Sequence, residues 1–86
     1  MITLEKAISI ARSNNKGLII DTYMDSGNDY IFPVDTPNGM DGSTFYYKVD
    51  KSTGDHGIFS DYWFMLMTDP KFGEAVAKKN KIKEAS

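Results

Sequence analysis

The sequence of 86 residues predicts an α+β fold: an N-terminal helix, a four-stranded antiparallel meander, and a C-terminal helix or helices packed on one face of the sheet. Three observations predict it. Residues 3–14 repeat apolar side chains with the helical period, residues 43–60 alternate apolar and polar side chains around a polar turn, and Asp69-Pro70 has the form of a helix start. A chain this short forms one domain, residues 1–86, and we expect two layers, with all helices on the same face.

The N-terminal helix is predicted from its apolar spacing and from its two ends. Thr3 is a suitable N-cap, and Gly17 can take the left-handed conformation that often follows a helix. The side chains at i, i+3, i+4 and i+7 form one apolar stripe: Leu4, Ala7, Ile8 and Ala11.

Two strands are predicted next, at residues 17–24 and 30–34, joined by a polar turn at residues 25–29. Pro33 has no N–H to donate, so the second strand is expected to lie at a sheet edge or to end near Pro33. Residues 35–42 then form a loop that is long enough to be shaped for contact.

The central hairpin occupies residues 43–60. Phe45, Tyr47 and Val49 alternate with polar neighbours, which predicts a strand with one face in the core. Residues 50–55 are turn formers, and Gly54 can adopt a positive φ at no steric cost. A second strand follows the turn.

The segment at residues 62–67, YWFMLM, predicts a short helix, with a strand as the alternative because so short an apolar run has no decisive period. Core packing against the sheet is the favoured interpretation of its aromatic side chains, and an interaction anchor is the alternative. A last helix begins at Pro70 with Asp69 as its N-cap, and a lysine-rich tail follows it.

Residues for chemistry are few. His56 is the single histidine and lies at a turn, and there is no cysteine, so neither a catalytic pair nor a zinc site is indicated. Residues 35–42 do not meet the spacing of a calcium loop, and no phosphate-binding glycine motif occurs. We therefore predict no enzyme activity, no metal and no cofactor.

Charge is unevenly distributed along the chain. Residues 20–70 hold nine aspartates against Lys48 and Lys51, a net charge of −7, whereas both flanking segments are basic. An acidic sheet would attract a basic protein partner and repel the phosphates of nucleic acid. The candidate partner-binding residues are Asp29, Asp35, Asp41, Tyr46 and Asp55.

The strand and turn Tyr47-Lys48-Val49-Asp50-Lys51-Ser52-Thr53-Gly54-Asp55 resembles the VDKxTG hairpin of the YrhB-like family of small bacterial immunity proteins. The order of a leading helix and a tail helix is also similar. The chain departs from the family at residues 28–30, where Asn-Asp-Tyr replaces a Gly-Trp strand start. The resemblance implies an immunity-type role, in which the protein holds a toxin inactive by covering its site.

The sequence thus predicts a small cytoplasmic binding protein that neutralises a basic toxin or another basic, nucleic-acid-binding partner. A phage-encoded inhibitor that mimics the charge of nucleic acid is equally compatible. No targeting segment or membrane-length apolar run is seen, so neither a membrane nor nucleic acid is an expected partner. The alternative is a structural module without catalysis that forms a homodimer through the strand near Pro33 or through residues 62–67.

Overall fold

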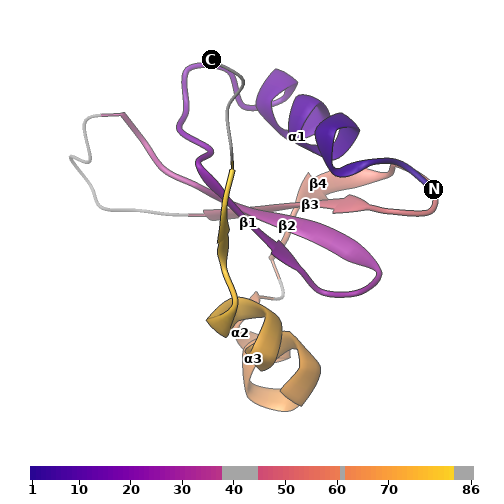
Figure 1. Ribbon diagram of the computed structural model, residues 1–86. Helices are drawn as coiled ribbons and strands as arrows, with labels where there is room; N and C mark the ends of the chain where they lie inside the picture. Colours follow the sequence, from indigo (N-terminus) through magenta and orange to yellow (C-terminus); the bar gives the residue numbers. More distant parts are fainter. Residues whose placement is uncertain (38–44, 61, 83–86) are drawn as a thin grey trace.

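The computed structural model describes residues 1–37, 45–60 and 62–82 (Figure 1). Within these ranges the strands form one antiparallel sheet in the order β4-β3-β2-β1-β5, so the predicted α+β fold is confirmed and gains a fifth strand. The elements, in chain order, are α1 (Leu4–Ser13), β1 (Thr22–Asp25), β2 (Asp29–Val34), β3 (Phe45–Asp50), β4 (His56–Ile58), α2 (Tyr62–Thr68), α3 (Pro70–Ala77) and β5 (Asn80–Lys81).

Helix α1 forms where its apolar stripe and its cap predict it. The Thr3 side chain accepts a hydrogen bond from the Lys6 backbone N–H at 3.1 Å, which satisfies one of the free donors of the first turn. Ala7 and Ala11 are fully buried against the sheet. Their small side chains let the helix approach β2 and β3 closely, so α1 covers one face of the sheet.

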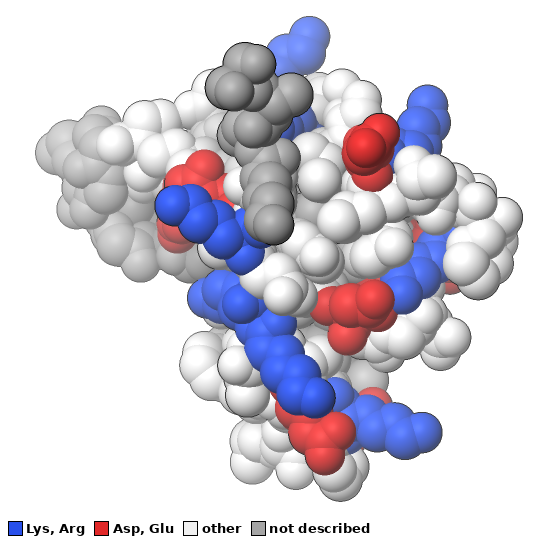
Figure 2. Space-filling view, viewed as in Figure 1, with Lys and Arg blue, Asp and Glu red and all other residues white. Residues whose placement is uncertain are grey.

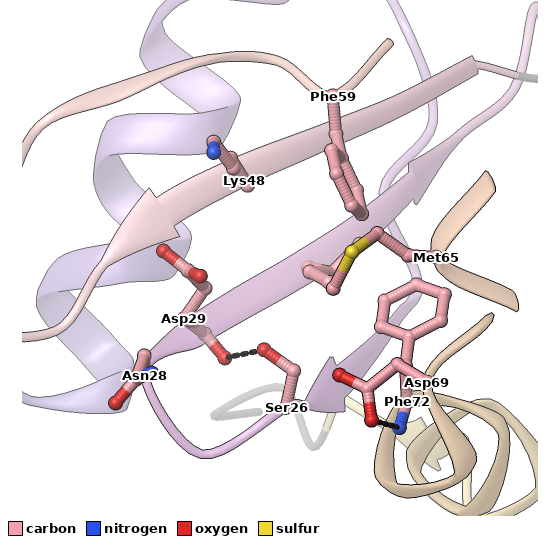
Figure 3. Close-up of a pocket in the computed structure, with 9 residues that line it drawn as sticks. Ser26, Asn28, Asp29, Lys48, Phe59, Met65, Asp69 and Phe72 are labelled. Atoms are coloured by element: carbon pink, nitrogen blue, oxygen red, sulfur yellow. Dashed lines mark hydrogen bonds between the residues drawn. The ribbon is translucent and has the colours of Figure 1, made fainter. Parts of the chain in front are cut away.

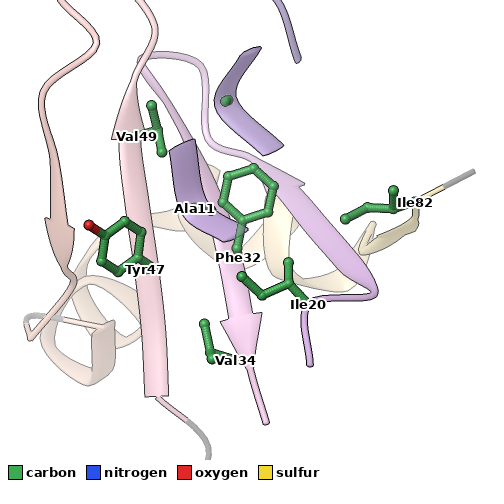
Figure 4. Packing of buried hydrophobic residues seen from close by; sticks show 8 residues of the cluster. Ala11, Ile20, Phe32, Val34, Tyr47, Val49 and Ile82 are labelled. Carbon is green, nitrogen blue, oxygen red and sulfur yellow. The ribbon is translucent and has the colours of Figure 1, made fainter. Parts of the chain in front are cut away.

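The sheet is covered on both faces, and the expected two-layer arrangement is wrong. Phe32 and Val34 of β2 pack in the cluster beneath α1 (Figure 4), whereas Ile31 packs in a second cluster with Tyr62 of α2 and Phe72 of α3. Figure 1 shows α1 on one side of the sheet and α2 and α3 on the other. The prediction that the C-terminal helices share one face is confirmed, but α1 lies on the opposite face, which gives three layers.

The position of β2 at the centre of the sheet, between the two layers of helices, explains its continuous apolar run. A strand that is buried on both faces reads as a continuous apolar run, as parallel strands usually do. Residues 31–34 are all buried, in contrast to β3, where burial alternates.

Pro33 lies in the middle strand, so its expected place in an edge strand is wrong, although β2 does end one residue later, at Val34. Pro33 is opposite Tyr46, whose carbonyl accepts a hydrogen bond from Phe59 on the far side of β3. The Pro33 nitrogen therefore points toward β1. Registered β1–β2 pairs stop at Ile31 and a bridge between Ile19 and Asp35 follows, so the missing N–H falls where the ladder is interrupted.

The hairpin β3–β4 is confirmed. One carboxylate oxygen of Asp50 accepts hydrogen bonds from the backbone N–H groups of Ser52 and Thr53, at 2.8 and 3.0 Å, and Gly54 has φ +80°. The Ser52 hydroxyl donates to the same oxygen at 2.8 Å. This hydrogen bond, together with those from the two backbone N–H groups, holds the carboxylate within its own turn and lowers the pKa of Asp50.

The C-terminal segment is helical at residues 62–68, which decides between the two predicted conformations. Asp69 caps α3, where its carboxylate accepts from the backbone N–H of Lys71 at 3.0 Å. β5 was not predicted: Lys81 pairs with Thr22 of β1, and the buried Ile82 completes the cluster beneath α1.

Candidate functional site

The predicted partner-binding residues do not come together. Asp29 begins β2 on the face of α2 and α3, Asp35 follows β2 and is exposed, and Asp55 is exposed in the turn before β4. Asp41 lies outside the described residues. Tyr46 is stacked on Tyr62, with ring centroids 3.8 Å apart and planes 2° apart, so its ring contributes to packing beneath α2.

The aspartates of the sheet are also divided between environments. The Asp25 carboxylate is 2.6 Å from the Lys51 ammonium, and this hydrogen bond lowers the pKa of Asp25. Figure 2 shows several basic side chains in one run across the lower left of the view, with separate acidic side chains beside them, so no continuous acidic surface is seen on this side of the molecule. The expected acidic sheet face is therefore not present among the described aspartates, because both sheet faces are covered by helices.

Helix α2 divides its side chains into an inward and an outward set. Tyr62 is buried, and Met65 and Leu66 are partly buried against the same cluster. The other three large side chains point outward and expose 70%, 68% and 84% of their surface: Trp63, Phe64 and Met67. We call these three residues the α2 outer face. Core packing, the favoured interpretation, holds for Tyr62 and is wrong for Trp63 and Phe64.

The α2 outer face is unusual for a monomeric surface. Single exposed apolar side chains are common, but these three lie within one helix of seven residues, at spacings of one, three and four positions that bring side chains on a helix close together. The helix also has no charged residue to solvate that face. Tryptophan and other aromatic residues are enriched where binding energy is concentrated.

A cleft of about 210 Å³ lies next to this helix, between β2–β3 and α2–α3 (Figure 3). Its apolar wall includes an aromatic pair, Phe59 and Phe72, whose ring centroids are 5.6 Å apart in an edge-to-face arrangement. The residues that line the cleft are Ser26, Asn28, Asp29, Ile31, Lys48, Phe59, Met65, Asp69 and Phe72.

Asp29 is placed in the cleft by the β1–β2 turn. Ser26 donates two hydrogen bonds to the Asp29 carbonyl, from its backbone N–H at 3.0 Å and from its hydroxyl at 3.2 Å. The side chain is half-buried, and the loss of solvation raises the pKa of Asp29, an effect that nearby Lys48 opposes. The cleft therefore contains a carboxylate that is held in an unfavourable environment.

The two other charged groups of the cleft already have contacts. The Lys48 ammonium lies 5.4 Å from the centroid of the Phe59 ring, within the range of a cation–π contact. The Asp69 carboxylate is bonded to the start of α3 through the N–H groups of Lys71 and Phe72. Asp29 was the one cleft residue among the predicted set; Lys48, Phe59 and Met65 were not predicted, because only the position of α2 brings them together.

The single histidine and the possible metal ligands were the remaining candidates for chemistry in the sequence. His56 is exposed on the edge strand β4, and its Nδ1 is hydrogen-bonded to the Tyr47 hydroxyl. Among described residues there is no group of three or more His, Cys, Asp or Glu side chains that could hold a metal ion.

No family model, curated protein or solved structure matches this chain. Within the described residues, no helix has the length and apolar character needed to cross a membrane.

Proposed function

We propose that this protein is a non-catalytic binding protein whose partner is another protein, and that the α2 outer face is the centre of the contact. The observation that carries the proposal is the exposure of Trp63, Phe64 and Met67 on a helix whose opposite side is buried. Covering large apolar side chains yields about 25 cal/mol per Å², so an exposed patch of this kind favours association.

The helix that presents this face is firmly attached to the sheet. Tyr62 stacks on Tyr46 and makes edge-to-face contacts with Phe59 and Phe72, with ring centroids 6.4 and 5.5 Å away. A partner would therefore meet a preorganised surface and would lose little free energy in ordering it.

We expect the partner to carry basic side chains next to the apolar surface that contacts α2. The cleft that Met65 of α2 helps to line holds Asp29 and Asp69 against the single cation Lys48. An immunity-type inhibitor that covers the site of a toxin, as the hairpin resemblance implies, is one protein with these properties.

Capture experiments with matched variants test the proposal. The double variant Trp63→Ala/Met67→Ala should lose a partner that the wild-type protein retains. Ile58→Ala is the control, since Ile58 is 65% exposed but pairs with Tyr47 and so lies on the α1 side of the sheet. A partner retained equally by the double variant would contradict the proposal.

A homodimer through α2 is the second candidate, and the lack of charge on α2 is the observation that favours it. A face without charges does not repel its own copy across a two-fold axis. Light scattering at increasing protein concentration decides the matter: a dimer that Trp63→Ala abolishes supports this candidate, and a monomer at all concentrations excludes it.

A further inference from the structure

The cleft between β2–β3 and α2–α3 has the size of one side chain. Its volume of about 210 Å³ is below the range of roughly 300–1,000 Å³ that is typical of small-molecule and cofactor sites. A long, narrow group that enters from a bound partner would fill it better than a cofactor.

The chemistry of the wall is divided between its two ends. Phe59 and Phe72 lie at one end of the cleft, and the Asp29 carboxylate lies toward the other end (Figure 3). Asp69 lies beside Phe72, but its carboxylate is already bonded to the N–H groups at the start of α3. Lysine and arginine have the matching division, with an apolar stem and a cationic head.

The Asp29 carboxylate lacks a partner among the described residues. None of them donates a hydrogen bond to it, and Lys48 makes no ion pair with it within 4.0 Å. Lys48 instead lies over the Phe59 ring. A carboxylate that has lost part of its hydration without gaining a hydrogen bond is a group that an incoming cation would stabilise.

We propose that this cleft receives one lysine or arginine side chain of the partner protein, with its cationic head on the Asp29 carboxylate and its stem against Phe59 and Phe72. This inference rests on the proposed protein-binding function and specifies the chemistry of the contact. An acidic side chain does not fit the cleft, because it would meet two carboxylates, Asp29 and Asp69, and only one ammonium group.

The test uses the full chain and small probes, followed by ¹H–¹⁵N NMR. N-acetyl-lysine amide and N-acetyl-arginine amide should shift the resonances of Asp29, Ile31, Phe59 and Phe72 saturably, with dissociation constants near 1–10 mM, as a contact this small allows. N-acetyl-glutamine amide is the neutral control and should bind at least tenfold more weakly.

Variants locate the contact. Asp29→Asn should weaken the binding of both cationic probes at least tenfold, while Asp55→Asn, which changes an exposed carboxylate in the β3–β4 turn, should leave it unchanged. Lys48→Met removes the rival cation and should strengthen binding. The spectra of the three variants, recorded without probe, also show whether each variant is folded.

Two results would overturn the inference: no saturable shift with either cationic probe, or equal binding of the neutral probe. The small probes bind in the cleft without contacting the α2 outer face. A failure of the cleft assignment can therefore be distinguished from a failure of the proposed function. If the probes fail but capture still depends on Trp63 and Met67, only the assignment of the cleft is lost.

Discussion

The two sides of the sheet are closed to different degrees. Beneath α1, the buried cluster includes large side chains from β2 and β3 together with Ile20 and Ile82. On the side of α2 and α3, fewer residues are buried, a cleft remains open, and the helix turns three large apolar side chains outward. The comparison teaches that the larger buried core and the exposed apolar helix lie on opposite faces of the sheet, although a groove lined by Leu4, Ile8 and Tyr23 also remains beside α1.

The α1 side should be the more sensitive to loss of volume. Phe32→Ala empties a fully buried site and should cost about 3–5 kcal/mol, which is comparable to the whole stability of a domain of this size. We expect the variant to lose the dispersed NMR spectrum of a folded protein or to unfold at a much lower urea concentration. A native spectrum with an unchanged midpoint would show that this face is not the main core.

Tyr62, on the α2–α3 side, should make the free energy of unfolding depend on pH in the alkaline range. Burial, with a contribution from the hydrogen bond with Tyr46, raises the pKa of Tyr62 to about 12. An unfolded tyrosine titrates near pH 10, so the unfolded state loses this proton first and the free energy of unfolding falls as the pH rises from 10 to 12. The full loss from Tyr62 should be about 3 kcal/mol, at roughly 1.36 kcal/mol for each pKa unit.

Tyr62→Phe separates this effect from the titration of the lysines. The variant should show a smaller loss of stability between pH 10 and 12 in urea titrations than the wild-type protein. Equal losses in the two proteins would mean that the Tyr62 hydroxyl is not protected by the fold.

Neutralising two aspartates in neighbouring strands should change the stability of the protein in opposite directions. Asp25→Asn removes the ion pair with Lys51 and should lower stability at pH 7 slightly, because exposed pairs contribute about 0–1 kcal/mol. Asp29→Asn removes a desolvated charge and should raise the urea midpoint.

The pH dependence of these two effects has opposite signs. The lowered pKa of Asp25 gives stability that is present above the unfolded pKa and is lost as the pH falls through the folded one. Because the pKa of Asp29 is raised in the folded state, its contribution to stability is greatest below the pKa of the unfolded state. That contribution is lost as the pH rises through the pKa of the folded state. Stability changes of the same sign in the two variants at pH 7 would contradict the assigned environments.

The smallest change is expected on the α2 outer face. Met67→Ala should alter stability by no more than about 0.5 kcal/mol, because the side chain is 84% exposed. A large loss, measured by urea unfolding, would show that Met67 supports the fold and would remove it from the proposed binding surface.

The sequence predicted the parts that depend on neighbouring residues. The cap at Thr3, the turn at residues 50–55 with Gly54, and the start of α3 at Asp69 each follow from interactions over a few positions. It did not predict β5, because the two residues of that strand have no apolar pattern and pair only because β1 offers an edge.

The candidate site was predicted less well for the same reason. Asp25 and Asp29 are alike in the sequence, but one meets Lys51 and the other enters the cleft. The outward direction of Trp63 depends on Tyr62 being the residue of α2 that stacks on the sheet. Such choices are made by tertiary contacts and leave no periodic signal in a helix of seven residues.

The pairing of Thr22 with Lys81 has a consequence for synthesis on the ribosome. β1 emerges early, but the strand that protects its outer edge is made almost at the end of the described chain. Until residue 82 has left the exit tunnel, that edge is unpaired and the cluster beneath α1 lacks Ile82. During translation the nascent chain must therefore pass through a stage in which an open strand edge can join another molecule.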